Sequence, residues 1–458
     1  MRQLLILPLV ILTGLALGQS AIQKPIFKMS SDSAKYHRWN NQLRLAFQNK
    51  ETELANALID SLAVLRATKI IGYRLVYEPR FPTLDSALRM APDRVIKLSL
   101  SGNHVKGLPR ELYTFKNLQT LELIDTAVPR IPGKLRNLPQ LKTLHVLNHA
   151  GKKRLRLGKN QTIRQLTIRT KDVRKIPRSF RALSRLEKLD LSSSGLVDFP
   201  KRIHQNKRLK TLILNDNKLT LTEPLKGHPG LEQLELRNNT IKTVSADIGR
   251  FPMLKRLIFT NNEISSVAPE IRLLQQLKEV AFYNNKLKTI PTGLYSISSL
   301  RELDLYYNEI ERLDPWITQW ENMEVLYLSN NRLIALPEAL GQLTSLKELY
   351  VSNNRLSTLP NSLMKLENLK VLRVNQNYLN DIPQAAYTLA LENLDVSRNK
   401  ITTVDHQLFT RKHLKILSLV GNEWDMMVRD LLPVWAEELR KNGTIVHLNT
   451  FEESIDGN

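Results

Sequence analysis

The sequence predicts an α/β fold in which one short unit repeats along most of the chain and stacks into a solenoid. The spacing L-x-x-L-x-L-x-x-N-x-L recurs at intervals of 23 residues, or 22 in three cases. A chain of 458 residues would otherwise suggest several compact domains, and a repetitive solenoid replaces that expectation. Fifteen repeats start at an apolar residue: Val95, Leu118, Leu141, Ile163, Leu186, Leu209, Leu231, Leu254, Leu277, Leu300, Met323, Leu346, Leu369, Leu391 and Leu414.

Each repeat predicts a short strand followed by a return segment. Residues four and six of a repeat, such as Leu303 and Leu305, are expected to point into the core, so residues three, five and seven point outward. Segments such as TLPNSLMKLENL then close the core from the other side. Asn at position nine can bond loop backbone groups that would otherwise lack partners. Eleven repeats carry it: Asn103, Asn217, Asn239, Asn262, Asn285, Asn308, Asn331, Asn354, Asn377, Asn399 and Asn422. Repeats two to five instead have Thr126, His149, Lys171 and Ser194.

Over residues 81–424 the chain resembles the leucine-rich repeat family, in its 23-residue class with a Leu-Pro pair, and specifically an exported, bacterial-type member. The resemblance implies a horseshoe-shaped solenoid with a parallel β-sheet on the concave side and irregular or helical segments on the convex side. It also implies a non-enzymatic scaffold that recognises proteins through the concave face. The Leu-Pro class includes cytoplasmic scaffolds of Ras-type signalling, from which this chain departs by carrying an export signal.

The two ends of the chain differ from the repeats. Residues 1–18 combine Arg2 with a run of 15 apolar residues and small residues at Ala16 and Gly18, which is typical of a signal peptide. A membrane anchor is the alternative, but this run is short for a bilayer. We therefore expect export, with no transmembrane segment in the mature chain. Residues 19–94 are expected to hold a helical segment and cap, with 31–68 helical and 19–30 loose. Residues 95–424 hold the repeats, and 425–458 a helical cap, a last strand at 444–448 and a tail.

Several classes of chemistry are not indicated. The absence of cysteine excludes disulfides, thiolate metal sites and a Cys nucleophile. Among nine histidines only His145 and His149 are close, and no third metal ligand accompanies them. Motifs for nucleotide binding or acyl transfer do not occur. The sequence thus predicts no enzyme, no cofactor and no metal site.

Outward strand positions of repeats nine to twelve place tyrosines beside carboxylates. Glu279 and Glu302 are expected to be cross-strand neighbours, an arrangement that costs stability unless a cation binds. Tyrosine supplies rigid contact area at binding sites, although it is also a good strand former. We therefore predict that this surface binds a protein, peptide or glycan with basic or stacking groups. Arg237 and Arg256 are expected two to three strands upstream. The predicted ligand-binding residues are Glu279, Tyr283, Glu302, Asp304, Tyr306, Tyr307, Tyr327, Glu348, Tyr350 and Arg373.

The positive charge is concentrated in one segment. The chain has a net charge of +23, and residues 130–210 contain 23 Lys and Arg against 4 Asp and Glu, a net of +19. Such density is expected to attract an anionic glycan, lipopolysaccharide, phospholipid head group or nucleic acid backbone, although a plain basic surface is an equal alternative. Base-specific reading is not expected, since no aromatic residues alternate with the basic ones. The candidate residues are Lys152, Lys153, Arg154, Arg156, Lys159, Arg164, Arg169, Lys171, Arg174 and Lys175.

Overall fold

A computed structural model describes residues 81–128, 130–148, 156–170, 180, 182–200, 202–222 and 224–448, together with the backbone of two strands nearer the N-terminus. The predicted signal at 1–18 and the predicted helical stretch at 31–68 lie outside the described residues. The two N-terminal strands, β1 (Ala21–Phe27) and β2 (Ile70–Tyr77), pair antiparallel. The prediction that 19–30 is loose is therefore wrong, since AIQKPIF and IIGYRLVY are rich in residues that favour strands.

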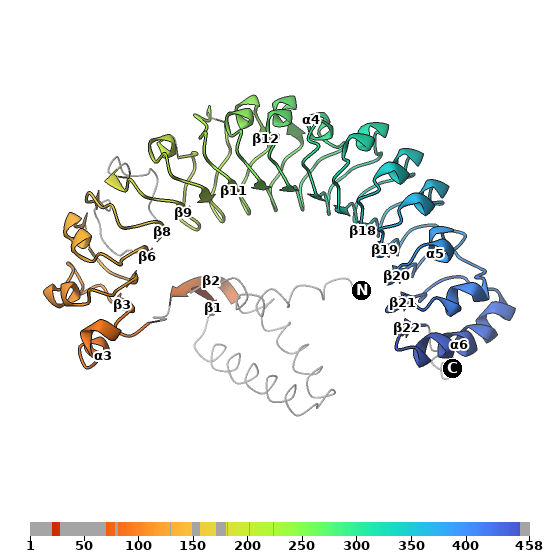
Figure 1. The fold of residues 1–458 in the computed structure, drawn as a ribbon, viewed down its shortest axis with the longest axis horizontal. Coiled ribbons are helices and arrows are strands. Elements are labelled where there is room, and N and C mark those ends of the chain that lie inside the picture. Colours follow the sequence, from red (N-terminus) through yellow and green to blue (C-terminus); the bar gives the residue numbers. More distant parts are fainter. Residues whose placement is uncertain are drawn as a thin grey trace. The chain divides into compact units, whose positions relative to one another are not determined.

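The chain divides into two compact units, one formed by Met1–Val128 with Val146–Lys152 and the other by Pro129–His145 with Lys153–Asn458. Sixteen parallel strands follow one another in sequence order in a single sheet, which confirms the predicted fold class. Within the larger unit the strands line the inner side of a curved stack and the short helices the outer side (Figure 1). The sixteen strands are β3 (Lys97–Ser101), β4 (Thr120–Ile124), β6 (Thr143–Leu147), β8 (Gln165–Arg169), β9 (Lys188–Asp190), β10 (Thr211–Ile213), β11 (Gln233–Glu235), β13 (Arg256–Ile258), β15 (Glu279–Ala281), β16 (Glu302–Asp304), β17 (Val325–Tyr327), β18 (Glu348–Tyr350), β19 (Val371–Arg373), β20 (Asn393–Asp395), β21 (Ile416–Ser418) and β22 (Ile445–His447).

The return segments are short because each repeat has few residues in which to cross back over the core. Most form one turn of 3₁₀-helix, often directly after an extended proline such as Pro337 or Pro360. Two pairs of very short strands, β5 (Arg130–Ile131) with β7 (Arg156–Leu157) and β12 (Thr243–Val244) with β14 (Ser266–Val267), also form on return segments. The helices are α3 (Leu84–Ala87), η3 (Pro92–Arg94), η4 (Arg110–Thr114), η5 (Gly133–Asn137), η7 (Ile203–Gln205), η8 (Ala246–Arg250), η9 (Pro269–Leu273), α4 (Thr292–Tyr295), η10 (Pro315–Gln319), η11 (Glu338–Gln342), η12 (Asn361–Lys365), α5 (Ala385–Thr388), η13 (His406–Thr410) and α6 (Met426–Lys441).

The core follows the predicted pattern. Leu303 and Leu305 are fully buried, as residues four and six of a repeat should be. Trp320 occupies a leucine position, is fully buried, and its Nε1 donates to the carbonyl of Leu294 at 2.9 Å. Trp316 in the same return segment is 61% exposed. A tryptophan fits the core here because its one polar atom finds a partner.

The asparagines at position nine bond loop backbone groups, as predicted. The Asn331 side-chain amide donates to the carbonyls of Leu305 and Leu328, both at 2.9 Å, and its oxygen accepts from the N–H of Ile310 at 3.0 Å. The same pattern recurs from Asn217 to Asn422. In this way each asparagine ties its own repeat to the loops of its neighbours.

Asn103 is the exception, and its assignment to this set is wrong. It is exposed, since the loop after β3 turns on Gly102 (φ +105°) and the Val105 N–H donates to the Gly102 carbonyl at 3.1 Å. Where position nine lacks asparagine, the side chains found there differ in whether they form hydrogen bonds. Ser194 donates to the carbonyl of Ile168 at 2.8 Å, whereas the buried hydroxyl of Thr126 has no hydrogen-bond partner.

Both ends of the described repeats carry the predicted elements. Helix α3 precedes β3, and helix α6 precedes the last strand, β22. The strand is Ile445–His447, one residue shorter at each end than the predicted 444–448. Within the described residues, helices never combine the length and the apolar character that crossing a membrane would require. The proposed domain boundaries at 18, 94 and 424 stay predictions.

Candidate functional site

The predicted ligand-binding residues lie together on the outward face of β15 to β19 and in the loops that follow β15 and β16. We call these ten residues the tyrosine–carboxylate surface. The strand register makes Glu279 the direct neighbour of Glu302, as predicted. One position further along the face, a row runs across four strands in the order Asp304, Tyr327, Tyr350 and Arg373. The repeat length therefore brings residues distant in sequence into adjacent positions about 4.8 Å apart.

The five tyrosines form two ring clusters. Tyr283 and Tyr306 stack with ring centroids 5.5 Å apart, and Tyr307 meets Tyr306 edge-on at 4.7 Å. Tyr327 and Tyr350 stack at 4.8 Å, and the Arg373 guanidinium lies 5.7 Å from the Tyr350 ring centroid. Neighbouring rings hold each other in place, so little side-chain freedom remains to be lost on binding.

The carboxylates are unequally partnered. Glu279 forms an ion pair with Arg256 at 2.9 Å, and Glu348 accepts from the Tyr350 hydroxyl at 2.6 Å. Arg256 lies on β13, the strand directly beside β15, so its placement two to three strands away is wrong. The cation that the Glu279–Glu302 pair was expected to require thus comes in part from the chain itself. The side-chain carboxylate of Glu302 makes no ion pair or hydrogen bond among the described residues.

Burial shifts the acidity of this surface. Asp304 is partly buried, and the one described hydrogen bond to its carboxylate comes from the Tyr306 N–H, at 3.0 Å. Burial is the main cause that raises the pKa of Asp304 to about 6. The pKa of Glu279 and of Glu302 is also raised, mainly by burial, and the charge of Asp304 contributes to the rise at Glu302. Burial and neighbouring negative charge therefore disfavour the ionised form of these carboxylates. A cation bound among them would stabilise that ionised form.

Tyr307 adopts a backbone conformation that disfavours its side chain. Position eight of nearly every repeat has a positive φ, and Asn, Asp or Gly usually fills it, as at Asn261 and Asn284. Tyr307 has φ +54° at this position and is 47% exposed. Bulky residues are rare in the left-handed region. Its ring lies outside the core and meets the rings of Tyr283 and Tyr306 edge-on.

A second asparagine ladder at position eight was not predicted. Asn261 donates to the side-chain oxygen of Asn238 at 2.7 Å, and Asn284 donates to that of Asn261 at 3.0 Å. Tyr307 ends this ladder, because a ring cannot continue a chain of amide hydrogen bonds. The recurrence of Asn, Asp and Gly at position eight was the signal in the sequence that could have revealed it.

The basic segment is only partly described. Lys152, Lys153, Arg154, Lys171, Arg174 and Lys175 lie outside the described residues, as does His149. Arg164 pairs with Glu187 at 2.8 Å, and Arg169 pairs with Asp190 at 2.7 Å and is largely buried. Arg156 and Lys159 are exposed. Pairing of β5 with β7 sets Arg156 beside Arg130, which is also exposed. Among the described residues, no group of three His, Cys, Asp or Glu side chains could hold a metal ion.

Part of the chain matches the model of a known protein family. The Leucine rich repeat family model matches residues 299–356, 321–379 and 344–399, which lie within the stack described above. The chain thus carries leucine-rich repeats, and its fold is a leucine-rich repeat solenoid. No curated protein sequence matches it.

Solved structures agree on the fold. A leucine-rich repeat protein of Leptospira interrogans has a TM-score of 0.54 and 25% identity, over 82% of this chain and 100% of that chain. An internalin of Listeria monocytogenes has a TM-score of 0.50 and 17% identity, over 79% of this chain and 88% of that chain. A chain of the Toll–Spätzle complex of Drosophila has a TM-score of 0.57 and 16% identity, over 72% of this chain and 54% of that chain.

Proposed function

We propose that this protein is a non-enzymatic binding scaffold whose tyrosine–carboxylate surface recognises a protein or peptide with basic side chains. The observation that carries the proposal is the pairing of stacked, half-buried tyrosines with carboxylates that lack a full set of cationic partners. Leucine-rich repeat proteins commonly mediate protein–protein interaction, which supports this class of function. The Toll–Spätzle structure is one case in which a similar fold belongs to a protein complex.

Recognition would combine two kinds of contact. An arginine or lysine of the partner would enter between Glu302 and Asp304, where a cation offsets two partly buried negative charges. The rings of Tyr306 and Tyr327 would cover the aliphatic part of that side chain and attract its charge. Tyr307 and Tyr350 would widen the contact area around this centre. Central aromatic and charged residues commonly dominate the binding energy of such surfaces.

A pull-down from native extracts tests the proposal. Changing Tyr306, Tyr327 and Tyr350 together to Ala should abolish recovery of the partner, because it removes most of the ring area. Tyr378→Ala is the control, since it removes an exposed tyrosine that lies outside the surface. Unaltered recovery by a folded triple variant would remove the proposal.

We also propose that the protein is exported. The support is the pattern of residues 1–18, with a basic residue, an apolar run and small residues before Gln19. Expression of the full chain fused to a reporter that is active only outside the cytoplasm tests this. Activity that persists after residues 4–18 are deleted would contradict it.

The alternative is binding of a polyanion through the basic segment. The observation that favours it is the exposed pair Arg130 and Arg156, held side by side on β5 and β7. Like charges directly opposite each other are destabilising unless an anion lies between them. Lys159, two residues beyond β7, adds a third exposed cation. Arg164 and Arg169 contribute less, since acidic residues already neutralise them.

Elution from a heparin column tests this alternative. Several charge contacts should hold the protein beyond about 0.15 M salt, with a steep dependence of retention on salt. Changing Arg130, Arg156 and Lys159 to Gln should move elution to lower salt. Elution of the unchanged protein below physiological salt would exclude polyanion binding.

A further inference from the structure

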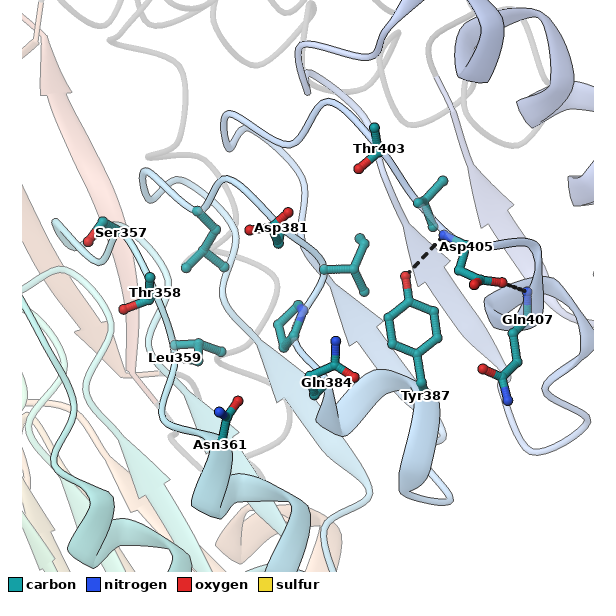
Figure 2. Close-up of a pocket in the computed structure, with 14 residues that line it drawn as sticks. Ser357, Thr358, Leu359, Asn361, Asp381, Gln384, Tyr387, Thr403, Asp405 and Gln407 are labelled. Atoms are coloured by element: carbon teal, nitrogen blue, oxygen red, sulfur yellow. Dashed lines mark hydrogen bonds between the residues drawn. The ribbon is translucent and has the colours of Figure 1, made fainter.

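A groove of about 500 Å³ lies on the return segments of repeats twelve to fourteen (Figure 2). None of its lining residues belongs to the tyrosine–carboxylate surface. It spans three successive repeats, starting at Leu346, Leu369 and Leu391. The volume is within the range of about 300–1,000 Å³ typical of sites for small ligands.

The repeat explains why a groove opens here. The middle repeat has 22 residues instead of 23, and its return segment forms the short helix α5. At the helix position that fills the core, the neighbouring repeats have Leu363 and Leu408, both buried, whereas this repeat has Ala386. We attribute the groove to this shorter segment with a smaller inward residue, and Tyr387 of α5 is one of the residues that line it.

The lining has two polar rows over an apolar floor. Position thirteen of the three repeats supplies Thr358, Asp381 and Thr403 (Figure 2). The second row consists of Asn361 in η12, Gln384 directly before α5, and Gln407 in η13. Position fourteen supplies the floor between the rows, with Leu359, Ile382 and Val404. The side chains of the two polar rows form no hydrogen bonds with each other or with other described residues. The groove therefore offers unused donors and acceptors around an apolar strip.

Tyr387 provides a fixed aromatic surface inside the groove. Its hydroxyl accepts the N–H of Asp405 at 3.2 Å, and Asp405 in turn accepts the N–H of Gln407 at 2.7 Å (Figure 2). The ring is thereby tied to the next repeat, while the hydroxyl hydrogen stays available to donate. Burial raises the pKa of Tyr387, so the hydroxyl keeps that hydrogen at neutral pH.

The chemistry of the lining selects a class of ligand. The lining contains Asp381 and Asp405 and no Lys, Arg or His, so an anion is disfavoured. Hydroxyls, amides and carboxylates around one aromatic ring and an apolar strip match a sugar, which has hydroxyls around its edge and apolar faces. We propose that this groove binds one or two uncharged sugar units of a glycan chain. The proposal is independent of the function proposed for the tyrosine–carboxylate surface.

Binding of uncharged oligosaccharides to the full chain tests the proposal. Chitotetraose and maltotetraose are the probes, with saturation-transfer NMR and calorimetry as readouts. We expect an affinity of about 1 mM for at least one of them, as suits a shallow site. Tyr387→Ala should weaken binding by about tenfold or more, and Asp381→Asn by several fold. Asp381 is exposed, so its variant should fold even if Tyr387→Ala does not.

Two controls make the result specific. Tyr378→Ala removes an exposed tyrosine of the same repeat outside the groove and should leave saccharide binding unchanged. Tyr306→Ala, on the tyrosine–carboxylate surface, should also have no effect. The proposal is overturned if neither oligosaccharide binds, if binding is the same in the folded Asp381→Asn and Tyr387→Ala variants, or if a heparin-derived oligosaccharide binds this groove more tightly than both.

Discussion

The carboxylate of Asp304 accepts a hydrogen bond from the backbone N–H of Tyr306, two residues along the chain, at 3.0 Å. No cation pairs with this carboxylate in the described residues, and its pKa is raised to about 6, mainly by burial. An unpaired, partly buried charge at neutral pH opposes folding. Asp304 therefore weakens the fold, and the binding that we propose for the tyrosine–carboxylate surface would account for its charge.

Asp304→Asn should therefore stabilise the protein at pH 7.5. The amide oxygen can keep the bond from Tyr306, and the buried charge disappears. The folded pKa of about 6 lies above the usual 3.8, so the folded state takes up its proton first as pH falls. The penalty of the charge is thus complete above pH 6 and fades between pH 6 and 4. The melting temperature of the variant should exceed that of the wild type at pH 7.5, and the difference should shrink at pH 4.5. An equal difference at both pH values would show that the charge of Asp304 is not its cause.

Tyr307→Asn should raise stability by about 0.5–1 kcal/mol, since asparagine tolerates the left-handed backbone better than tyrosine. The new side chain could also continue the ladder from Asn284. The same change should weaken partner recovery, because the edge-on contact with Tyr306 is lost. Chemical denaturation measures the first effect. A destabilised variant would mean that the Tyr307 ring contributes more to the fold than its backbone conformation costs.

Asn331→Ala should cost about 2–3 kcal/mol. The change leaves the buried N–H of Ile310 without its acceptor. It also removes one of the two side-chain bonds at the carbonyls of Leu305 and Leu328, which keep those from Asn308 and Asn354. Asn368→Ala is the control, because Asn368 makes one exposed bond, to the carbonyl of Thr344 at 2.9 Å, and should cost little. Urea denaturation of both variants checks this. A similar loss of stability in the two variants would show that burial does not determine how much the asparagine hydrogen bonds contribute to stability.

Trp320→Ala should cost about 3–5 kcal/mol, because it removes a fully buried ring together with its hydrogen bond to the carbonyl of Leu294. Trp316→Ala, only four residues earlier, should change stability by less than about 1 kcal/mol, since that ring is 61% exposed. Thermal melting followed by circular dichroism measures both. A large loss from Trp316→Ala would indicate packing that its exposure does not suggest.

Much of the candidate site could be predicted from the sequence once the repeat was recognised. With a repeat step of 23 residues, residues 23 apart occupy equivalent positions on adjacent strands. The pairing of Glu279 with Glu302 and of Tyr327 with Tyr350 could therefore be predicted by counting. The partner of Glu279 was harder, because the reach of Arg256 across one strand depends on side-chain conformation. The stacking of the tyrosine rings could not be predicted from the sequence either, since it depends on side-chain rotamers and on the space that neighbouring side chains leave.

The sequence by itself determined the solenoid, the inward and outward residues of each strand, the asparagine ladder and the helix before the last strand. All of these depend on periodicity, which is a local property repeated many times. Only the tertiary structure decided which carboxylates lack a cation, that Asn103 leaves the ladder, that Tyr307 has a left-handed backbone, and that a groove opens beside Tyr387. Those features depend on how a shorter repeat or a single side chain is accommodated between two neighbours, which no spacing in the sequence records.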